Sequence, residues 1–420
     1  MRRLWPLIVA VVAVALGLLF LPGVFRGTPH VTAVPPSVPP TSAVHDSTAQ
    51  TSTGQNTQTH PGAPAAAPTP PAPRVTVDGP AVQPPATDPH AIYAFTHVGM
   101  FSPAVRGLVP RVYVPNGKDG TVSVIDPQTF RVLSTFRVDQ EPQHVVPSHD
   151  LQTLWVASDK GRQSLTPIDP KTGRPGTAIP TADPYNLYFT PDGLHAVVVA
   201  ENQGRLNFVD PHTMKPQFSL AVPCRGINHM DFSPDGHSVL AACEFSGDLL
   251  KIDLQARRVL GTLHVGGMPQ DVKLSPDGQV YYVADMMANG VYLVDAASDT
   301  PKKLGFLPTG KGTHGLYPSR DATRLFISNR GEGTVSVLDF ERRSLVARWR
   351  IPGGGSPDMG SVSPDGTQLW LSGRYNDEVY VFDTRSGRLL RRIPVGRGPH
   401  GLTYFPQPGR YSLGHTDNYR

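Results

Sequence analysis

From residue 111 onward, short apolar runs alternate with polar turns in one recurring unit. Each unit consists of an apolar run, a turn such as SPDG, a β-branched run, a loop containing Gly or Asn, a run ending in Asp, and a last run leading to Pro or Gly. Short β-branched and apolar runs bounded by turn residues are typical of β-strands. The pattern therefore predicts an all-β chain built from repeated units of four strands.

The Asp that ends the third strand of each unit marks the repeat. It recurs at intervals of 41 to 44 residues, at Asp126, Asp169, Asp210, Asp253, Asp295, Asp339 and Asp383. Units of four strands repeated every 40–45 residues or so predict a β-propeller, because each sheet can bury its faces only against its neighbours. Seven marks predict seven four-stranded antiparallel blades. We expect these Asp residues and the SPDG turns to accept backbone N–H bonds, not to act as catalytic acids.

Ring closure is predicted from the two ends of the repeat. The first unit, which starts at RVYVPN (111–116), lacks an innermost strand, and HGLTYF (400–405) can supply one. Pairing the two ends in one blade removes the open sheet edge. The chain then continues as PQPGRYSLGH (406–415), so an incomplete eighth blade completed by residues 91–108 is the alternative.

The repeated strings also carry a resemblance. YVPN at Tyr113, YVAD at Tyr282, FISN at Phe326 and the recurring SPDG and VSVID make residues 111–420 similar to the YVTN-repeat bacterial propellers. The resemblance implies a ring architecture and export from the cytoplasm. That family resembles lactonases and haem- or quinone-associated propellers, so the resemblance implies no particular reaction.

The first 90 residues have a different composition. Arg2 and Arg3 precede an apolar run that is long enough to cross a bilayer, so residues 1–27 are predicted to be a transmembrane signal anchor with the rest of the chain outside. A cleavable signal peptide, which would make the protein secreted, is the alternative. Residues 28–90, rich in Pro, Ala, Thr and Ser, predict a disordered linker. Residues 91–420 are then the propeller domain, on the extracytoplasmic side of the cell membrane.

Charge and cysteine content narrow the function further. The net charge of +4 is too small for nucleic-acid binding. We also expect the propeller to be monomeric. The two cysteines, Cys224 and Cys243, are predicted to lie at the same end of one blade and to form a disulfide. A soft-metal site made by both cysteines with His229 is the alternative.

A candidate site follows from the residues that begin each innermost strand. These positions recur every 42 to 44 residues and should ring the mouth of the central channel, on the face opposite the SPDG turns. The predicted ring is His144, Asn186, His229, Asp271, His314, Asp358 and His400. Loops on the same face add the candidates Glu201, Glu244, Asp285, Asn329, Arg330 and Arg374.

Imidazole and carboxylate groups bind Zn, Cu, Fe or Mn, and a ring of seven is too wide for one ion to contact every member. Any metal would therefore use two to four adjacent groups, with His144, His229, His314 and His400 as the first candidates. Polar, water-filled channel lining is the simpler interpretation of the same ring.

Three functions are consistent with this sequence. An anchored, rigid propeller on a stalk suits a binding scaffold that presents its channel-mouth face to an envelope protein, peptide or polymer. The alternatives are a lactonase- or lyase-type enzyme with a divalent metal at the channel mouth, or a propeller that carries haem or a related cofactor. The sequence identifies neither a cofactor nor a substrate.

Overall fold

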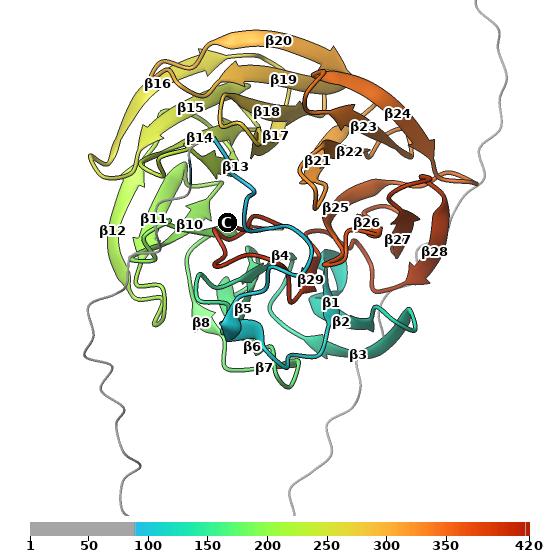
Figure 1. Ribbon diagram of the computed structural model, residues 1–420. Coiled ribbons are helices and arrows are strands. Elements are labelled where there is room, and N and C mark those ends of the chain that lie inside the picture. The colour runs from blue at the N-terminus through green and yellow to red at the C-terminus, as the bar shows by residue number, and fades with distance from the viewer. Residues whose placement is uncertain (1–87, 89, 416) are drawn as a thin grey trace, which may run out of the picture. The chain divides into compact units, whose positions relative to one another are not determined.

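The computed structural model describes residues 88, 90–415 and 417–420, and these form a seven-bladed β-propeller (Figure 1). The sheets follow one another around a ring in chain order, and the C-terminus lies at the centre of that ring. The expected anchor (1–27) and nearly all of the expected linker (28–90) lie outside the described residues. No helix in the described part of the chain is long and apolar enough to cross a membrane.

The blades are antiparallel sheets with their first strand nearest the axis. Blade 1 consists of β29 (Thr403–Phe405), β1 (Arg111–Asn116), β2 (Thr121–Asp126) and β3 (Arg131–Arg137). Blade 2 consists of β4 (Pro142–Pro147), β5 (Leu154–Ser158), β6 (Ser164–Asp169) and an outer strand split into β7 (Arg174–Pro175) and β8 (Ile179–Pro180). Blade 3 consists of β9 (Pro184–Phe189), β10 (Ala196–Ala200), β11 (Arg205–Val209) and β12 (Pro216–Ala221). Blade 4 consists of β13 (Ile227–Phe232), β14 (Ser238–Cys243), β15 (Asp248–Asp253) and β16 (Arg258–His264).

The remaining blades repeat this order. Blade 5 consists of β17 (Pro269–Leu274), β18 (Val280–Asp285), β19 (Gly290–Asp295) and β20 (Lys303–Pro308). Blade 6 consists of β21 (Thr313–Pro318), β22 (Arg324–Asn329), β23 (Thr334–Asp339) and β24 (Ser344–Arg350). Blade 7 consists of β25 (Pro357–Val362), β26 (Gln368–Gly373), β27 (Glu378–Asp383) and β28 (Leu389–Pro394). Two short 3₁₀ helices, η1 (Pro103–Val105) and η2 (Gly117–Asp119), flank β1.

The core lies between neighbouring blades. Leu240 and Leu249 of blade 4, for example, pack in one cluster with Val272 and Tyr281 of blade 5. Every residue of an innermost strand such as β13 is buried, whereas the outermost strand β3 is almost entirely exposed. Because each sheet is covered by the next, burial is complete only when the ring closes.

The predicted turn roles and ring closure are confirmed. All seven repeat Asp side chains accept backbone N–H bonds within their turns. Strand β29 pairs with β1, with Tyr113 opposite Thr403, so the C-terminal strand completes blade 1. The alternative of an eighth blade is wrong, because residues 91–108 contain only η1 and the chain after Phe405 turns inward.

The two ends of the described chain close one face of the ring. We call the face formed by the SPDG-type turns the turn face, and the opposite face, formed by the loops between second and third strands, the loop face. The C-terminal hairpin, as we call residues 409–415 and 417–420, enters the channel from the turn face, and the segment 90–108 crosses over it (Figure 1). Phe101 pairs with Gly409, and Tyr93 packs in the blade 4–5 cluster. The expectation of a water-filled channel is therefore wrong, since protein occupies its centre.

Candidate metal centre

Irregular strand pairing positions the ring residues. In blade 4 the β13–β14 register shifts between Ile227 and Met230, across His229. Similar shifts occur at Asp271 in blade 5 and at His314 in blade 6. A β-bulge turns one side chain away from the regular alternation of a strand and often lies next to a functional site.

The structure brings the predicted ring residues together, but inside the propeller and not at an open mouth. Each of the seven side chains is at most 2% exposed; they are His144, Asn186, His229, Asp271, His314, Asp358 and His400. The mouth placement is therefore corrected: the hairpin covers these side chains from the turn face, and Tyr185, itself 7% exposed, contacts them from the side.

A fifth histidine, which the sequence analysis missed, lies among them. His415 belongs to the C-terminal hairpin, and its ring centroid lies 5.2 Å from that of His144 and 4.8 Å from that of His229. No repeat pattern extends past Phe405, so nothing in the spacing indicated this residue. Together, His144, His229, His314, His400 and His415 form what we call the histidine cluster.

One half of the cluster is a set of three imidazoles. The ligand atoms of His144, His229 and His415 lie within 4.8 Å of one another. Both ring nitrogens of His144 and both of His229 are buried without a hydrogen-bond partner among the described residues. A buried polar atom left unpaired costs about 1–3 kcal/mol, so these nitrogens are suited to a ligand.

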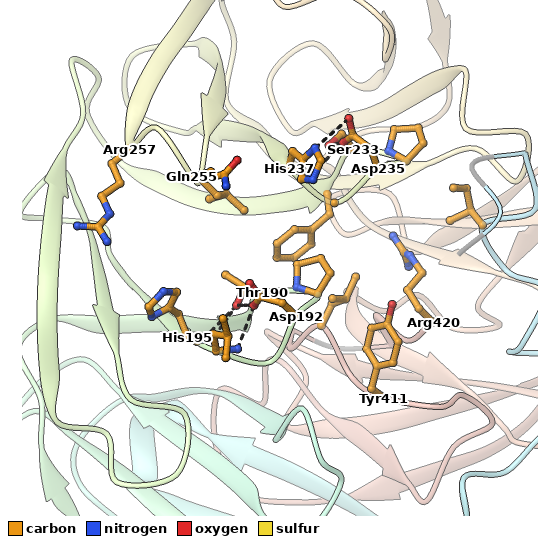
Figure 2. A pocket seen from close by; sticks show the side chains of 18 of the residues that line it. Thr190, Asp192, His195, Ser233, Asp235, His237, Gln255, Arg257, Tyr411 and Arg420 are labelled. Carbon is orange, nitrogen blue, oxygen red and sulfur yellow. Dashed lines mark hydrogen bonds and ion pairs between the residues drawn. The ribbon is translucent and has the colours of Figure 1, made fainter. Parts of the chain in front are cut away.

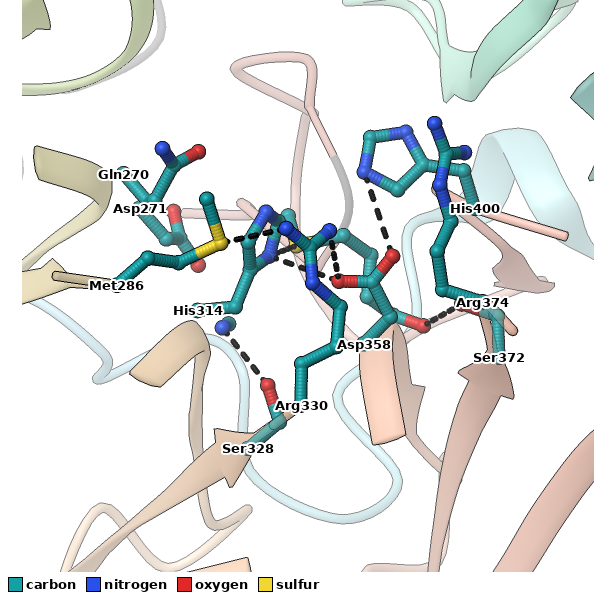
Figure 3. Close-up of polar contacts among 12 residues, drawn as sticks. Gln270, Asp271, Met286, His314, Ser328, Arg330, Asp358, Ser372, Arg374 and His400 are labelled. Carbon is teal, nitrogen blue, oxygen red and sulfur yellow. Dashed lines mark hydrogen bonds and ion pairs between the residues drawn. The ribbon is translucent and has the colours of Figure 1, made fainter. Parts of the chain in front are cut away.

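The other half combines imidazole with carboxylate (Figure 3). Nδ1 of His314 lies 3.1 Å from Oδ1 of Asp358, and Nε2 of His400 lies 3.6 Å from Oδ2 of the same carboxylate. Arg330 Nη1 also lies 3.2 Å from Asp358 Oδ1. In this half the Asp358 carboxylate is already paired with the Arg330 guanidinium, whereas the ring nitrogens of His144 and His229 in the other half have no partner among the described residues.

Burial keeps the cluster neutral. It lowers the pKa of His229 to about 3 and holds the pKa of His144 well below 6.5. Burial likewise holds the pKa values of His314 and His400 well below that value. Neutral imidazoles have the free lone pairs that metal binding requires.

The loop candidates divide into two groups. Glu201, Glu244, Arg330 and Arg374 surround the cluster on the loop-face side, where their charges act on Tyr185 or Asp358. Asp285 instead accepts a backbone N–H bond from Ala288 in its own turn and another from Met268, which directly precedes β17. Asn329 donates to Thr334 and Ser336 within blade 6, so these last two side chains have local structural roles.

The two cysteines form the predicted disulfide, Cys224–Cys243. The soft-metal alternative with His229 is therefore wrong, because both sulfur atoms are used. Disulfides persist mainly in oxidising compartments.

An open cavity near the hairpin is separate from the histidine cluster. A cavity of about 470 Å³ lies at the turn face. It is lined by SPDG-type turns of blades 3 and 4 and by the hairpin residues Tyr411 and Arg420 (Figure 2). None of the ring residues lines it. The histidine cluster is consequently an enclosed site, distinct from this surface hollow.

Comparison with known proteins agrees with the architecture. The model of the YNCE-like beta-propeller family matches residues 79–408, which covers the blades and stops before the hairpin. This agrees with the resemblance seen in the YVPN and SPDG strings.

Individual relatives are distant. Antigen Lp49 of Leptospira interrogans is 24% identical over 186 residues, which cover 38% of this chain and only 39% of that protein. The periplasmic gluconolactonase of Pseudomonas aeruginosa superposes with a TM-score of 0.60 at 18% identity, covering 71% of this chain and 99% of the other. Kuenenia stuttgartiensis hydrazine synthase gives a TM-score of 0.58 at 21% identity, covering 65% and 92%. At these identities the two structures share the fold alone.

Proposed function

The chain belongs to the YNCE-like β-propeller family, and from that premise we propose that it binds a divalent transition-metal ion in its histidine cluster. The observation that carries the proposal is the set of four unpaired, buried ring nitrogens on His144 and His229. Neutral imidazole suits Zn²⁺, Cu²⁺ and Ni²⁺, whereas Mg²⁺ and Ca²⁺ prefer oxygen ligands. The metal would be held by side chains from different blades, so it would also tie the ring together.

The test is metal content in purified full-length protein. Wild-type chain dialysed against Zn²⁺ or Cu²⁺ and then desalted should retain about one ion per chain. The double variant His144→Ala, His229→Ala should lose retention, with affinity falling at least about 100-fold, because it removes two ligands. His237→Ala is the matched control, since His237 is an exposed turn-face histidine. Equal retention by the double variant and the control would overturn the proposal.

The earlier alternatives need room that the cluster lacks. Ring centroids within it lie 4.8–6.1 Å apart, for example His144–His400 and His229–His314, so the imidazoles fill the space that a tetrapyrrole would need. A lactonase or lyase must bring a substrate carbonyl to the ion. The histidine and aspartate side chains of the ring are at most 2% exposed, so a substrate has no access to an ion held by them. Binding of the ion, without turnover, is therefore the function we propose for this site.

A second candidate is the binding scaffold, with its partner on the loop face. The observation that favours it is a set of exposed apolar side chains on loops of that face: Phe245 is 48% exposed, and Met287 and Tyr375 are each 64% exposed. Aromatic and Met side chains are enriched at protein interfaces. The disulfide supports an extracytoplasmic location, and a partner in the cell envelope follows from that location.

Site-specific cross-linking tests the scaffold. A photo-reactive amino acid at Tyr375 should yield discrete adducts in intact cells, and one at Leu133, which is 57% exposed but on the outer strand β3, should not. The scaffold candidate fails if both positions give the same adducts or neither gives any.

A further inference from the structure

The C-terminal hairpin is an addition to the propeller and not part of its closure. Strand β29, which completes blade 1, ends at Phe405, and the family match ends at residue 408. The hairpin, residues 409–415 and 417–420, therefore lies beyond the strand that completes blade 1. The hairpin runs inward to the centre of the ring (Figure 1), and its His415 lies beside His144 and His229.

Blade 3 holds the hairpin by backbone bonds. Phe189 N donates to Leu413 O at 2.9 Å, and His415 N donates to Leu187 O at 2.9 Å. Between these bonds lies Gly414, with φ of +83°, where a Cβ atom would come within 2.4 Å of Leu187 O. Only glycine permits so close an approach, so the hairpin tip is fixed against β9.

Buried ion pairs fix the rest of the hairpin. Arg420 Nη2 lies 2.8 Å from Asp231 Oδ1 on β13, and Arg320 Nη2 lies 2.8 Å from Asp417 Oδ1. All four side chains are almost fully buried. Buried ion pairs of this kind hold the hairpin in place against the blades, because moving either partner away leaves a buried charge unpaired.

This anchoring holds His415 beside His144 and His229. Its Nε2 donates to Asp271 Oδ1 at 3.3 Å, the arrangement in which a carboxylate orients a metal-binding imidazole. Nδ1 accepts from the Asn186 amide at 3.0 Å, and the amide is oriented by the bond that Leu187 N donates to its oxygen. Nδ1 therefore carries the lone pair, which can bind an ion in exchange for that hydrogen bond.

We infer that the C-terminal hairpin is a ligand-bearing plug, which brings His415 to His144 and His229 and so completes a three-imidazole site for Zn²⁺ or Cu²⁺. Ion binding and hairpin docking then stabilise each other, because the ion contacts both the blades and the hairpin. The inference rests on the proposed metal binding and deepens it by naming the third ligand and the element that controls the site.

Affinity measurements on the full-length chain test the third ligand. Zn²⁺ competition titrations should show His415→Ala binding about 10- to 100-fold more weakly than wild type, with His264→Ala, an exposed histidine on β16, unchanged. With Cu²⁺, electron paramagnetic resonance should show one nitrogen ligand fewer in His415→Ala. Unchanged affinity and nitrogen count in that variant would overturn the inference while leaving the proposed function intact. Failure of wild type to bind either ion would overturn both.

Hydrogen exchange tests the coupling between ion binding and hairpin docking. Zn²⁺ should slow amide exchange in the hairpin, at residues 411–415 and 417–420, more than in the outer strands. If Zn²⁺ slowed exchange only in the blades, hairpin docking would not be coupled to ion binding, and the inference would be contradicted. A His415→Gln variant, which keeps a polar side chain of similar length, should lose the Zn²⁺-induced slowing, and retention of it there would contradict a ligand role.

Discussion

Burial shifts the pKa values of the buried His and Glu side chains in opposite directions, and both types are uncharged at neutral pH. The imidazoles are neutral because burial lowers their pKa values. Glu201 is different: burial, and then the neighbouring Glu244 carboxylate, raises its pKa to about 9. The Glu201 side chain is therefore protonated at neutral pH in the folded protein and ionised in the unfolded chain.

This difference predicts a pH-dependent stability. Since the folded pKa of Glu201 lies above the unfolded value of 4.5, its contribution to folding stability falls as pH rises from 4.5 toward 9. Glu201→Gln removes the titration and should raise the free energy of unfolding on the order of 4 kcal/mol more at pH 8 than at pH 5, because each of the three pH units between them contributes about 1.4 kcal/mol. Denaturant unfolding at both pH values measures this, with exposed Glu341→Gln as control. An equal effect at pH 5 and pH 8 would contradict the raised pKa.

At the scale of elements, local signals fixed the strands and turns. Pro, Asp and Gly in SPDG hold their turns through bonds within a few residues, so the sequence alone predicted them, as it did the closing strand β29. The ring residues were predictable because they recur at the repeat spacing. The bulges at His229, Asp271 and His314 depend on pairing with the second strand of each blade, and the spacing does not encode them. The burial of the ring was therefore not predicted.

The disulfide gives an element-scale prediction. Cys224 precedes β13 and Cys243 ends β14, 19 residues later in sequence. Replacing both with Ala should lower the free energy of unfolding by about 3 kcal/mol, because the unfolded chain regains the entropy of a short loop. Guanidinium unfolding of the variant measures the loss, and wild type treated with reductant should lose a similar amount. Identical midpoints for oxidised wild type and variant would contradict a stabilising bond.

At the scale of the whole molecule, the propeller brings together four histidines that lie 85 or 86 residues apart in sequence, and it encloses them, with His415, between blades and hairpin. The equal spacing of His144, His229, His314 and His400 made four of the five predictable. His415 follows no repeat, and only the inward course of the chain after β29 places it in the cluster. The anchor and linker remain expectations for the part of the chain outside the described residues.

The central claim is that this enclosed cluster binds a transition-metal ion, and X-ray absorption at the zinc edge tests it most directly. Zn²⁺-loaded full-length protein should show nitrogen neighbours at about 2.0–2.1 Å, with the outer-shell scattering of about three imidazole rings and no sulfur. A spectrum dominated by oxygen neighbours without imidazole scattering would place the ion on surface carboxylates and contradict the account.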